Sequence, residues 1–180
     1  MQRPSRGFCA KETILCASVR LRGDVEFELE QLSHLLAVHR ELVRKSGDCL
    51  PSSVELSALA MMLHSFYTGV ENIFKRIAVD SGDQTLSGEN WHRALLDSML
   101  RPASSRPVVI SPETHESLGD YRAFRHVFRN AYSFDLDWGK LAPLVADCDS
   151  TLKRLDGELR LFLENEDDRH GEGRADRPVP

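Results

Sequence analysis

The chain lacks the motifs of the common metal-binding and cofactor-dependent protein classes. Its four cysteines are widely scattered, with no CxxC spacing and no companion histidines at zinc-finger intervals. There is also no Gly-rich phosphate loop, nucleophile elbow or metalloprotease motif. These absences argue against structural zinc and a disulfide framework, and we expect the protein to use neither a metal ion nor a cofactor.

Long hydrophobic runs and an excess of positive charge are also missing. No run approaches the roughly 20 apolar residues of a membrane span, and Lys11 and Glu12 interrupt the apolar N-terminal stretch that a secretory signal would need. We therefore expect a cytoplasmic protein without membrane contact. The net charge of −5 argues against nucleic-acid binding through bulk electrostatics, but it leaves room for a local basic patch.

Helical periodicity is the strongest pattern that the sequence does contain. With 180 residues, of which 41% are apolar, the chain fits one globular domain. Asp24 is interpreted as the N-cap of a first helix. Ser52 and Glu55 match the capping-box spacing at the start of a second helix. The apolar stripe of that second helix alternates steps of three and four through Leu56, Leu59, Leu63, Phe66, Val70, Ile73 and Ile77.

Three more helices are expected in the second half of the chain. A short helix is centred on Leu95, and Ser111 with Pro112 gives a strong start signal for the next one. Before that start, residues 108–110 are predicted to form a strand-like stretch across the bundle. A last long helix begins near Asp137.

These elements predict an all-α fold, an antiparallel four-helix bundle with an additional short helix. We expect the bundle to cover residues 24–166. Residues 1–23 form a leader of uncertain structure. Residues 167–180 are polar and rich in glycine and charge, which predicts a disordered tail.

The segment "RHVFRNAYSFDLDW", residues 125–138, puts three cations, an amide and a tyrosine into its first eight residues. At 100° per residue, Arg122, Arg125 and Arg129 lie within an arc of roughly 60° beside the buried face, and Tyr132 projects about 20° from Arg125. Such an arginine ridge suits phosphate groups, because a guanidinium stays charged and presents a planar fork of donors. Arginines at a helix C-terminus also interact favourably with the helix dipole and pair with acidic side chains, so a purely structural role is the alternative.

Three segments of the chain resemble landmarks of one protein family. They are "LHSFYTGVENIFKRIA" (63–78), "WHRALLDSM" (91–99) and "YRAFRHVFRNAYSFDLDW" (121–138), and they resemble the HepT-like branch of the HEPN superfamily over about residues 24–165. That branch consists of small all-α ribonuclease toxins paired with a nucleotidyltransferase antitoxin, with a site shared across a dimer cleft. The resemblance implies a homodimer, RNA as the substrate and a nucleotidyltransferase antitoxin as the partner.

The family motif is Arg, four to six residues, His, one residue, Tyr. By this resemblance Arg125 takes the arginine position, and Tyr132 takes that of the tyrosine to which the antitoxin adds AMP. Asn130 stands at the histidine position. Because a neutral amide cannot exchange a proton near pH 7, the proton-transfer role needs another residue, and His126 is the candidate substitute.

Two functional hypotheses follow from this resemblance. The first is a toxin that cleaves RNA without a metal ion in a dimer cleft, with the candidate catalytic residues Arg125, Asn130 and His126 and with Arg122 and Arg129 bound to RNA phosphates. The alternative is a catalytically inactive module that binds the nucleotidyltransferase, RNA or both without cleavage, which Asn130 favours. A helical scaffold whose arginines only pair with acids is the third possibility.

One Glu-x-x-His pair, Glu89 and His92, lies outside these motifs. Di-iron helical bundles need two such pairs and further glutamates on facing helices, which the sequence does not offer. We therefore interpret Glu89 and His92 as a surface pair at the start of a helix.

Overall fold

The structure, a computed structural model, describes residues 10–82, 90–103, 106–129 and 136–172, with side chains from Val19 to Glu166 within these ranges. These residues form five helices and contain no strand, which confirms the all-α prediction. The helices are α1 (Ala10–Asp48), α2 (Ser53–Asp80), α3 (Trp91–Met99), α4 (Pro112–Phe128) and α5 (Trp138–Glu172).

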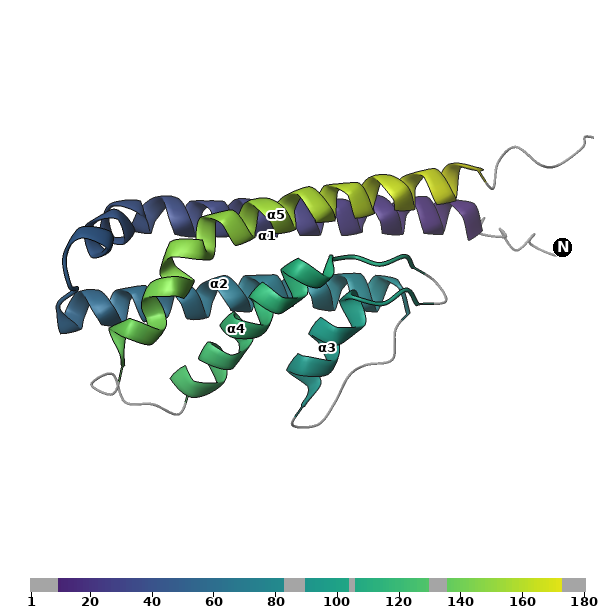
Figure 1. Cartoon of the computed structure of the whole chain (residues 1–180). Coiled ribbons are helices and arrows are strands. Elements are labelled where there is room, and N and C mark those ends of the chain that lie inside the picture. Colours follow the sequence, from purple (N-terminus) through teal and green to yellow (C-terminus); the bar gives the residue numbers. More distant parts are fainter. Residues whose placement is uncertain (1–9, 83–89, 104–105, 130–135, 173–180) are drawn as a thin grey trace, which may run out of the picture.

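Three long helices run along the length of the molecule, and two shorter ones pack beneath them (Figure 1). α1 and α2 form an antiparallel hairpin, and α5 returns along α1, so that the start of α1 and the end of α5 lie at the same end. α4 crosses obliquely, while the short α3 contacts α2 and α4. The specific four-helix bundle arrangement stays a prediction.

α2 is the central helix, because it contacts each of the other four. Its buried residues, which line more than one of its faces, are Leu59, Ala60, Met62, Leu63, Phe66, Tyr67, Gly69, Val70, Glu71, Ile73, Phe74, Ile77 and Ala78. Each large apolar side chain in this set contributes about 1.5–3 kcal/mol through removal from water. Glu71 is the charged residue in the set, and it has a place in the site described below.

Local hydrogen bonds explain where three of the helices begin. Ser52 and Glu55 form a complete capping box at the start of α2, as the sequence predicts. The Ser111 hydroxyl accepts from the backbone N–H of Thr114, and Pro112 follows it as the first helical residue of α4. The Asp137 carboxylate accepts from the backbone N–H of Gly139 at 2.9 Å, at the predicted start of α5.

The predicted start of the first helix is wrong. α1 begins at Ala10 and continues through Asp24, so Asp24 is not an N-cap. Its carboxylate instead lies 2.9 Å from Nη1 of Arg76 on α2, and Nη2 of the same arginine lies 3.4 Å from Glu28. Asp24 is thus an interior residue of α1 whose carboxylate forms an ion pair with the neighbouring helix. The limits predicted for the bundle, the leader and the tail stay predictions, although α5 itself extends to Glu172.

The described residues 106–110 before α4 form no strand, so the strand-like stretch predicted at 108–110 is wrong. The backbone N–H groups of Val109 and Ile110 donate to the carbonyl of Met99, the last residue of α3. Arg106, only 1% exposed, donates to the carbonyls of Ser98 at 3.0 Å and Arg101 at 3.2 Å. These donors satisfy carbonyl groups at the end of α3, where a cation is favoured by the helix dipole.

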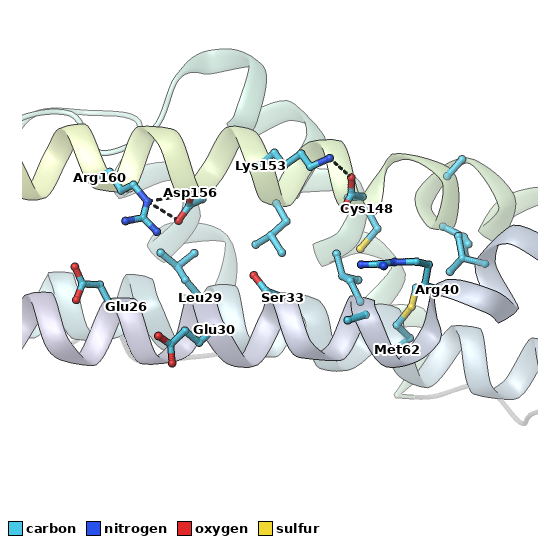
Figure 2. Close-up of a pocket in the computed structure, with 17 residues that line it drawn as sticks. Glu26, Leu29, Glu30, Ser33, Arg40, Met62, Cys148, Lys153, Asp156 and Arg160 are labelled. Carbon is cyan, nitrogen blue, oxygen red and sulfur yellow. Dashed lines mark hydrogen bonds and ion pairs between the residues drawn. The ribbon is translucent and has the colours of Figure 1, made fainter.

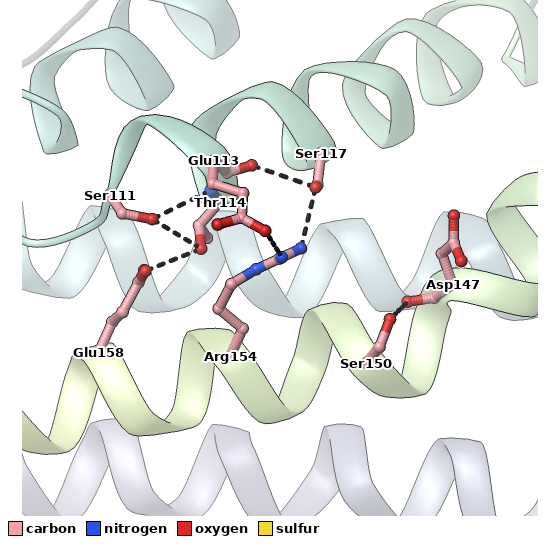
Figure 3. A network of polar contacts seen from close by, with 8 residues as sticks. All are labelled: Ser111, Glu113, Thr114, Ser117, Asp147, Ser150, Arg154 and Glu158. Carbon is pink, nitrogen blue, oxygen red and sulfur yellow. Dashed lines mark hydrogen bonds and ion pairs between the residues drawn. The ribbon is translucent and has the colours of Figure 1, made fainter.

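A polar network attaches the first half of α4 to α5 (Figure 3). The buried Thr114 donates its hydroxyl to Glu158 at 2.9 Å, and Arg154 donates to the hydroxyl of Ser117 at 3.0 Å. Further along α4, the buried Tyr121 donates its hydroxyl to the carbonyl of Leu144 at 2.8 Å. These bonds fix the helix that carries Arg122, Arg125 and Arg129.

A groove of about 980 Å³ lies between α1 and α5 (Figure 2). The cations on its α5 side are paired within that helix, Lys153 with Asp149 at 2.6 Å and Arg160 with Asp156 at 3.0 Å. None of the described residues predicted for the site lines this groove. The candidate site therefore lies elsewhere, on the side of α2 that α3 and α4 cover.

Candidate functional site

Arg125 lies at the junction of α2, α3 and α4, inside a group of charged and polar side chains. Its Nη1 lies 3.2 Å from Nε2 of His92 on α3, and its Nε lies 3.5 Å from Oε2 of Glu71 on α2. Nδ1 of His92 makes a very short contact with the other carboxylate oxygen of Glu71. Three helices thus contribute one side chain each to a closed arrangement of carboxylate, imidazole and guanidinium.

The contacts of His92 determine its protonation state. A guanidinium has only donors, so Nε2 of His92 acts as the acceptor towards Arg125. The ring proton must then be on Nδ1, which donates to Glu71. Burial lowers the pKa of His92, and the positive charges of Arg125 and Lys75 lower it further, whereas Glu71 raises it. The net lowering favours the neutral ring near pH 7. His92 therefore presents a basic lone pair on Nε2 beside an arginine.

Burial differs sharply among the three side chains. The Glu71 side chain is 2% exposed, whereas those of Arg125 and His92 are 16% and 19% exposed. A carboxylate at this depth is stable only with cationic or hydrogen-bonding partners, and Arg125 and His92 supply them. The edges of Arg125 and His92 still reach solvent, so an incoming ligand has access to them but not to Glu71.

Aromatic rings border the site on α3. The rings of Trp91 and His92 lie 3.6 Å apart between centroids, and Nζ of Lys75 lies 4.6 Å from the centre of the Trp91 ring. Tyr67, one turn before Glu71 on α2, is fully buried, and burial together with Glu71 raises its pKa. The packing of Trp91 restricts rotation of the His92 ring, and Tyr67 stays protonated.

A second histidine, His64, lies on α2 nearer the end of α4. Its ring lies 5.3 Å from that of Phe128 between centroids. Burial, and then the charges of Arg125 and Arg129, lower the pKa of His64. Its Nδ1 is buried without a hydrogen-bond partner among the described residues. We call the set His64, Glu71, His92, Arg125 and Arg129 the histidine–arginine cluster.

The arginine ridge predicted from spacing is divided between interior and surface. Arg125 is mostly buried and ion-paired with Glu71, whereas Arg122 is half-buried and Arg129 is exposed. Neither Arg122 nor Arg129 forms a side-chain ion pair with another residue in the described part of the chain. These two cations are therefore more accessible to a solvent-borne anion than Arg125 is.

The other predicted site residues differ in how far the structure describes them. His126 is exposed, and it follows Arg125 directly, so the two side chains leave α4 about 100° apart. A histidine that Arg125 does contact, His92, comes from α3. Asn130 and Tyr132 lie outside the described residues, so their predicted roles as the motif residue and the modified tyrosine stay predictions.

The interpretation of His92 as a surface residue is wrong. It does lie at the start of α3, but its carboxylate partner is the buried Glu71, and Glu89 lies outside the described residues. The sequence analysis missed Glu71 altogether. Its signal was an acid that directly follows Val70, inside the apolar stripe of the second helix, where a charge requires a partner from another element.

α3 and α4 also share a second histidine–carboxylate pair away from the cluster. Nε2 of His115 lies 2.8 Å from Oδ1 of Asp97. Arg93 approaches the other oxygen of Asp97 at 3.6 Å. None of the contacts found for this pair among the described residues involves the histidine–arginine cluster, so the pair is a matched control for experiments on His92.

Two features are absent from the described residues. No group of three or more histidine, cysteine, aspartate or glutamate side chains is arranged to hold a metal ion among the residues that the structure describes. None of the helices in these same ranges is both long and apolar enough to cross a membrane.

The chain matches one protein-family model. The match is to the HepT-like protein family and covers residues 58–165, more than half of the chain and the whole of α3 and α4. No curated protein and no solved structure matches it significantly. The matched residues include Glu71, His92 and Arg125. The resemblance noted from the sequence is thus confirmed, and the chain belongs to the HepT-like protein family.

Proposed function

We propose that this HepT-like chain is the toxin of a toxin–antitoxin pair, a metal-independent RNA endonuclease whose site lies in the cleft of a homodimeric HEPN-type helical bundle. The observation that carries the proposal is the contact of Arg125, the motif arginine, with a histidine whose lone pair faces it. Family membership gives the expectation of a HEPN-type toxin module. The contact adds a cation and a proton acceptor at one point, which is what cleavage of an RNA phosphodiester requires.

In this proposal the arginines act on the phosphate. Arg122 and Arg129 bind the RNA backbone, and Arg125 stabilises the negative charge that develops as the 2′-hydroxyl attacks phosphorus. Asn130, at the histidine position of the motif, donates and accepts hydrogen bonds but transfers no proton. A histidine must supply proton transfer. His126 was predicted for that role, but the contact of Arg125 with His92 favours His92.

The proposed partner is a nucleotidyltransferase antitoxin, which adds AMP to Tyr132. AMP would bring a negative charge and a bulky base to the same segment as Arg125 and Arg129. A covalently attached phosphate next to these arginines would compete with RNA for them. Modification of Tyr132 would therefore silence the site through occupation of its cations.

The second candidate function is a module that binds the nucleotidyltransferase or RNA without cleavage. Two observations favour it. Asn130 replaces the motif histidine, and the buried Glu71 already neutralises Arg125 within one chain. In this case the histidine–arginine cluster is a structural ion-pair network, and Arg122 and Arg129 serve only to bind the polyanion.

Incubation of the purified protein with total RNA, with and without the nucleotidyltransferase, separates the two functions. If the chain is a ribonuclease, RNA is degraded in the presence of a chelator. Arg125→Lys keeps the charge near Glu71 but loses the planar fork, so the cleavage rate should fall by about 10²–10³-fold. Arg154→Lys is the matched control, because Arg154 is also partly buried and acid-paired but lies on α5 and contacts Glu113 and Ser117 in the first half of α4.

The results assign the function directly. A stable complex with the nucleotidyltransferase and intact RNA in every reaction would support the binding module and reject the ribonuclease. Degradation that proceeds equally with Arg125→Lys would mean that the nuclease activity, if it belongs to this chain, does not use the motif arginine.

A further inference from the structure

We propose that His92, held by Glu71, is the residue that accepts the 2′-hydroxyl proton in RNA cleavage, so that α3 supplies the proton-transfer group that the Arg125 to Tyr132 motif lacks. This inference rests on the proposed ribonuclease function and names a residue for it outside the motif. Glu71 is then a positioning residue, because it contacts the imidazole and not the substrate.

The orientation of the His92 ring is the first support. Glu71 accepts the proton of Nδ1, which leaves the lone pair of Nε2 directed towards the guanidinium of Arg125. A buried carboxylate behind an imidazole fixes the tautomer and stabilises the imidazolium that forms when the ring takes up a proton. The 3.2 Å contact sets Nε2 beside the group proposed to hold the phosphate, the position that a general base must have.

The charge state of His92 is the second support. Burial lowers its pKa, so the ring is neutral and able to accept a proton near pH 7. The charged groups that face it are Glu71 and Lys75 from α2 and Arg125 from α4. When an RNA phosphate binds Arg125, an added negative charge near the ring favours the imidazolium and increases the basicity of Nε2.

The other histidines of the region fit the role less well. His126 follows Arg125 directly on α4, so its side chain leaves the helix about 100° away from that of the arginine. His64 interacts electrostatically with Arg125, but no carboxylate orients its ring and its buried Nδ1 has no partner among the described residues. His92 alone in the described cluster combines a contact to Arg125 with a carboxylate that fixes its tautomer.

The proposed step conserves atoms and charge. The 2′-oxygen forms a bond to phosphorus while its proton passes to Nε2 of His92, and the bond between phosphorus and the 5′-oxygen breaks. The 5′-oxygen takes a proton from solvent water, and the products are a 2′,3′-cyclic phosphate and a 5′-hydroxyl end. His92 then returns its proton to solvent. For Nε2 to reach the 2′-hydroxyl, Nη1 of Arg125 must turn from the histidine to the phosphate.

The test uses the full chain and a fluorescent oligoribonucleotide of mixed sequence, with a fully 2′-O-methylated copy as the uncleavable control. His92→Gln should lower the cleavage rate by about 10²–10⁴-fold, the usual effect of a lost general base, while affinity for the 2′-O-methylated oligonucleotide stays the same. His92→Ala should regain part of its rate on addition of imidazole. Glu71→Gln should lower the rate and move the rising limb of the pH–rate profile to lower pH, because the carboxylate raises the pKa of His92.

His115→Gln is the matched control, since His115 also pairs with a carboxylate on the α3–α4 side but lies apart from Arg125. Its rate should equal that of the unchanged chain. A cleaving protein in which His92→Gln retains the full rate overturns the inference and leaves the ribonuclease proposal intact. A second result also overturns the inference and marks His92 as a structural residue. In that result imidazole does not restore the rate of His92→Ala, and the pH–rate profile of Glu71→Gln is unshifted. No cleavage by the unchanged chain rejects the proposed function itself, and the inference with it.

Discussion

Removal of the arginine side chain at position 125 should destabilise the protein strongly, whatever the function of the site. Arg125→Met keeps much of the side-chain volume but leaves the Glu71 carboxylate, 2% exposed, with His92 as its remaining partner. Loss of one member of a buried ion pair costs about 3–5 kcal/mol. Because Arg125 is 16% exposed and His92 stays in place, we expect the lower end, about 3 kcal/mol.

A double-mutant cycle separates the pairing from the packing. Glu71→Gln alone removes the buried charge and leaves an arginine that still reaches solvent, so its cost should be smaller, about 1–3 kcal/mol. When Arg125→Met and Glu71→Gln are combined, no charge remains unpaired. The double variant should therefore lose less than the two single losses together, with a coupling energy of about 1–3 kcal/mol.

The assay is urea unfolding at pH 7, followed by far-UV circular dichroism and by tryptophan fluorescence, because Trp91 packs against His92. Arg154→Met is the control, since its partner Glu113 is 73% exposed and the pair should contribute no more than about 1 kcal/mol. If Arg125→Met is as mild as Arg154→Met, or if the two changes in the cycle add without coupling, the argument from a buried, compensated carboxylate is wrong.

Three smaller predictions test other parts of the structure by the same unfolding assay. Ser52→Ala removes the hydroxyl of the capping box at the start of α2 and should cost about 1 kcal/mol. Tyr121→Phe removes the hydrogen bond from α4 to the carbonyl of Leu144 and should also cost about 1 kcal/mol. Burial, Arg125 and Arg129 lower the pKa of His64 in the folded state. The unfolded chain, in which the pKa of histidine is about 6.5, therefore binds the proton more tightly than the folded protein does, and the free energy of unfolding falls as pH drops below that value. His64→Gln removes this titrating group. It should reduce the decrease in urea midpoint between about pH 7.5 and about pH 5.5.

Helix boundaries were predictable where a local signal determines them. Ser52, Ser111 with Pro112, and Asp137 satisfy backbone N–H groups within their own helix start, so a few neighbouring residues contain all the information. Asp24 is an aspartate like Asp137, but it is an interior residue of α1. Its carboxylate pairs with Arg76 of another helix and not with backbone N–H groups at a helix start. A cap and an interhelical ion pair cannot be told apart from the sequence of one helix alone.

The candidate site was predictable only in part, for a related reason. Periodicity located Arg125 at the margin of the buried face of α4, which the structure bears out through its partial burial. It did not indicate that Glu71 and His92 meet there, since that contact depends on how α2, α3 and α4 pack against one another. The signal in the sequence was Glu71, an acidic residue directly after Val70 of the apolar stripe, and the sequence alone does not indicate which helix supplies its partner.

The pairing of Arg125 with Glu71 does not by itself prevent the arginine from binding RNA. A guanidinium offers a fork of N–H donors, and among the described residues its contacts to Glu71 and His92 involve Nε and Nη1. Nη2, together with Nη1 once it turns from His92, can then bind a phosphate while Nε stays beside the carboxylate. Glu71 then acts as a fixed anchor that orients the fork, and it reduces the repulsion that two copies of Arg125 would experience across a dimer axis. The acid that makes Arg125 look purely structural is thus also what would hold its guanidinium in the geometry that phosphoryl chemistry needs.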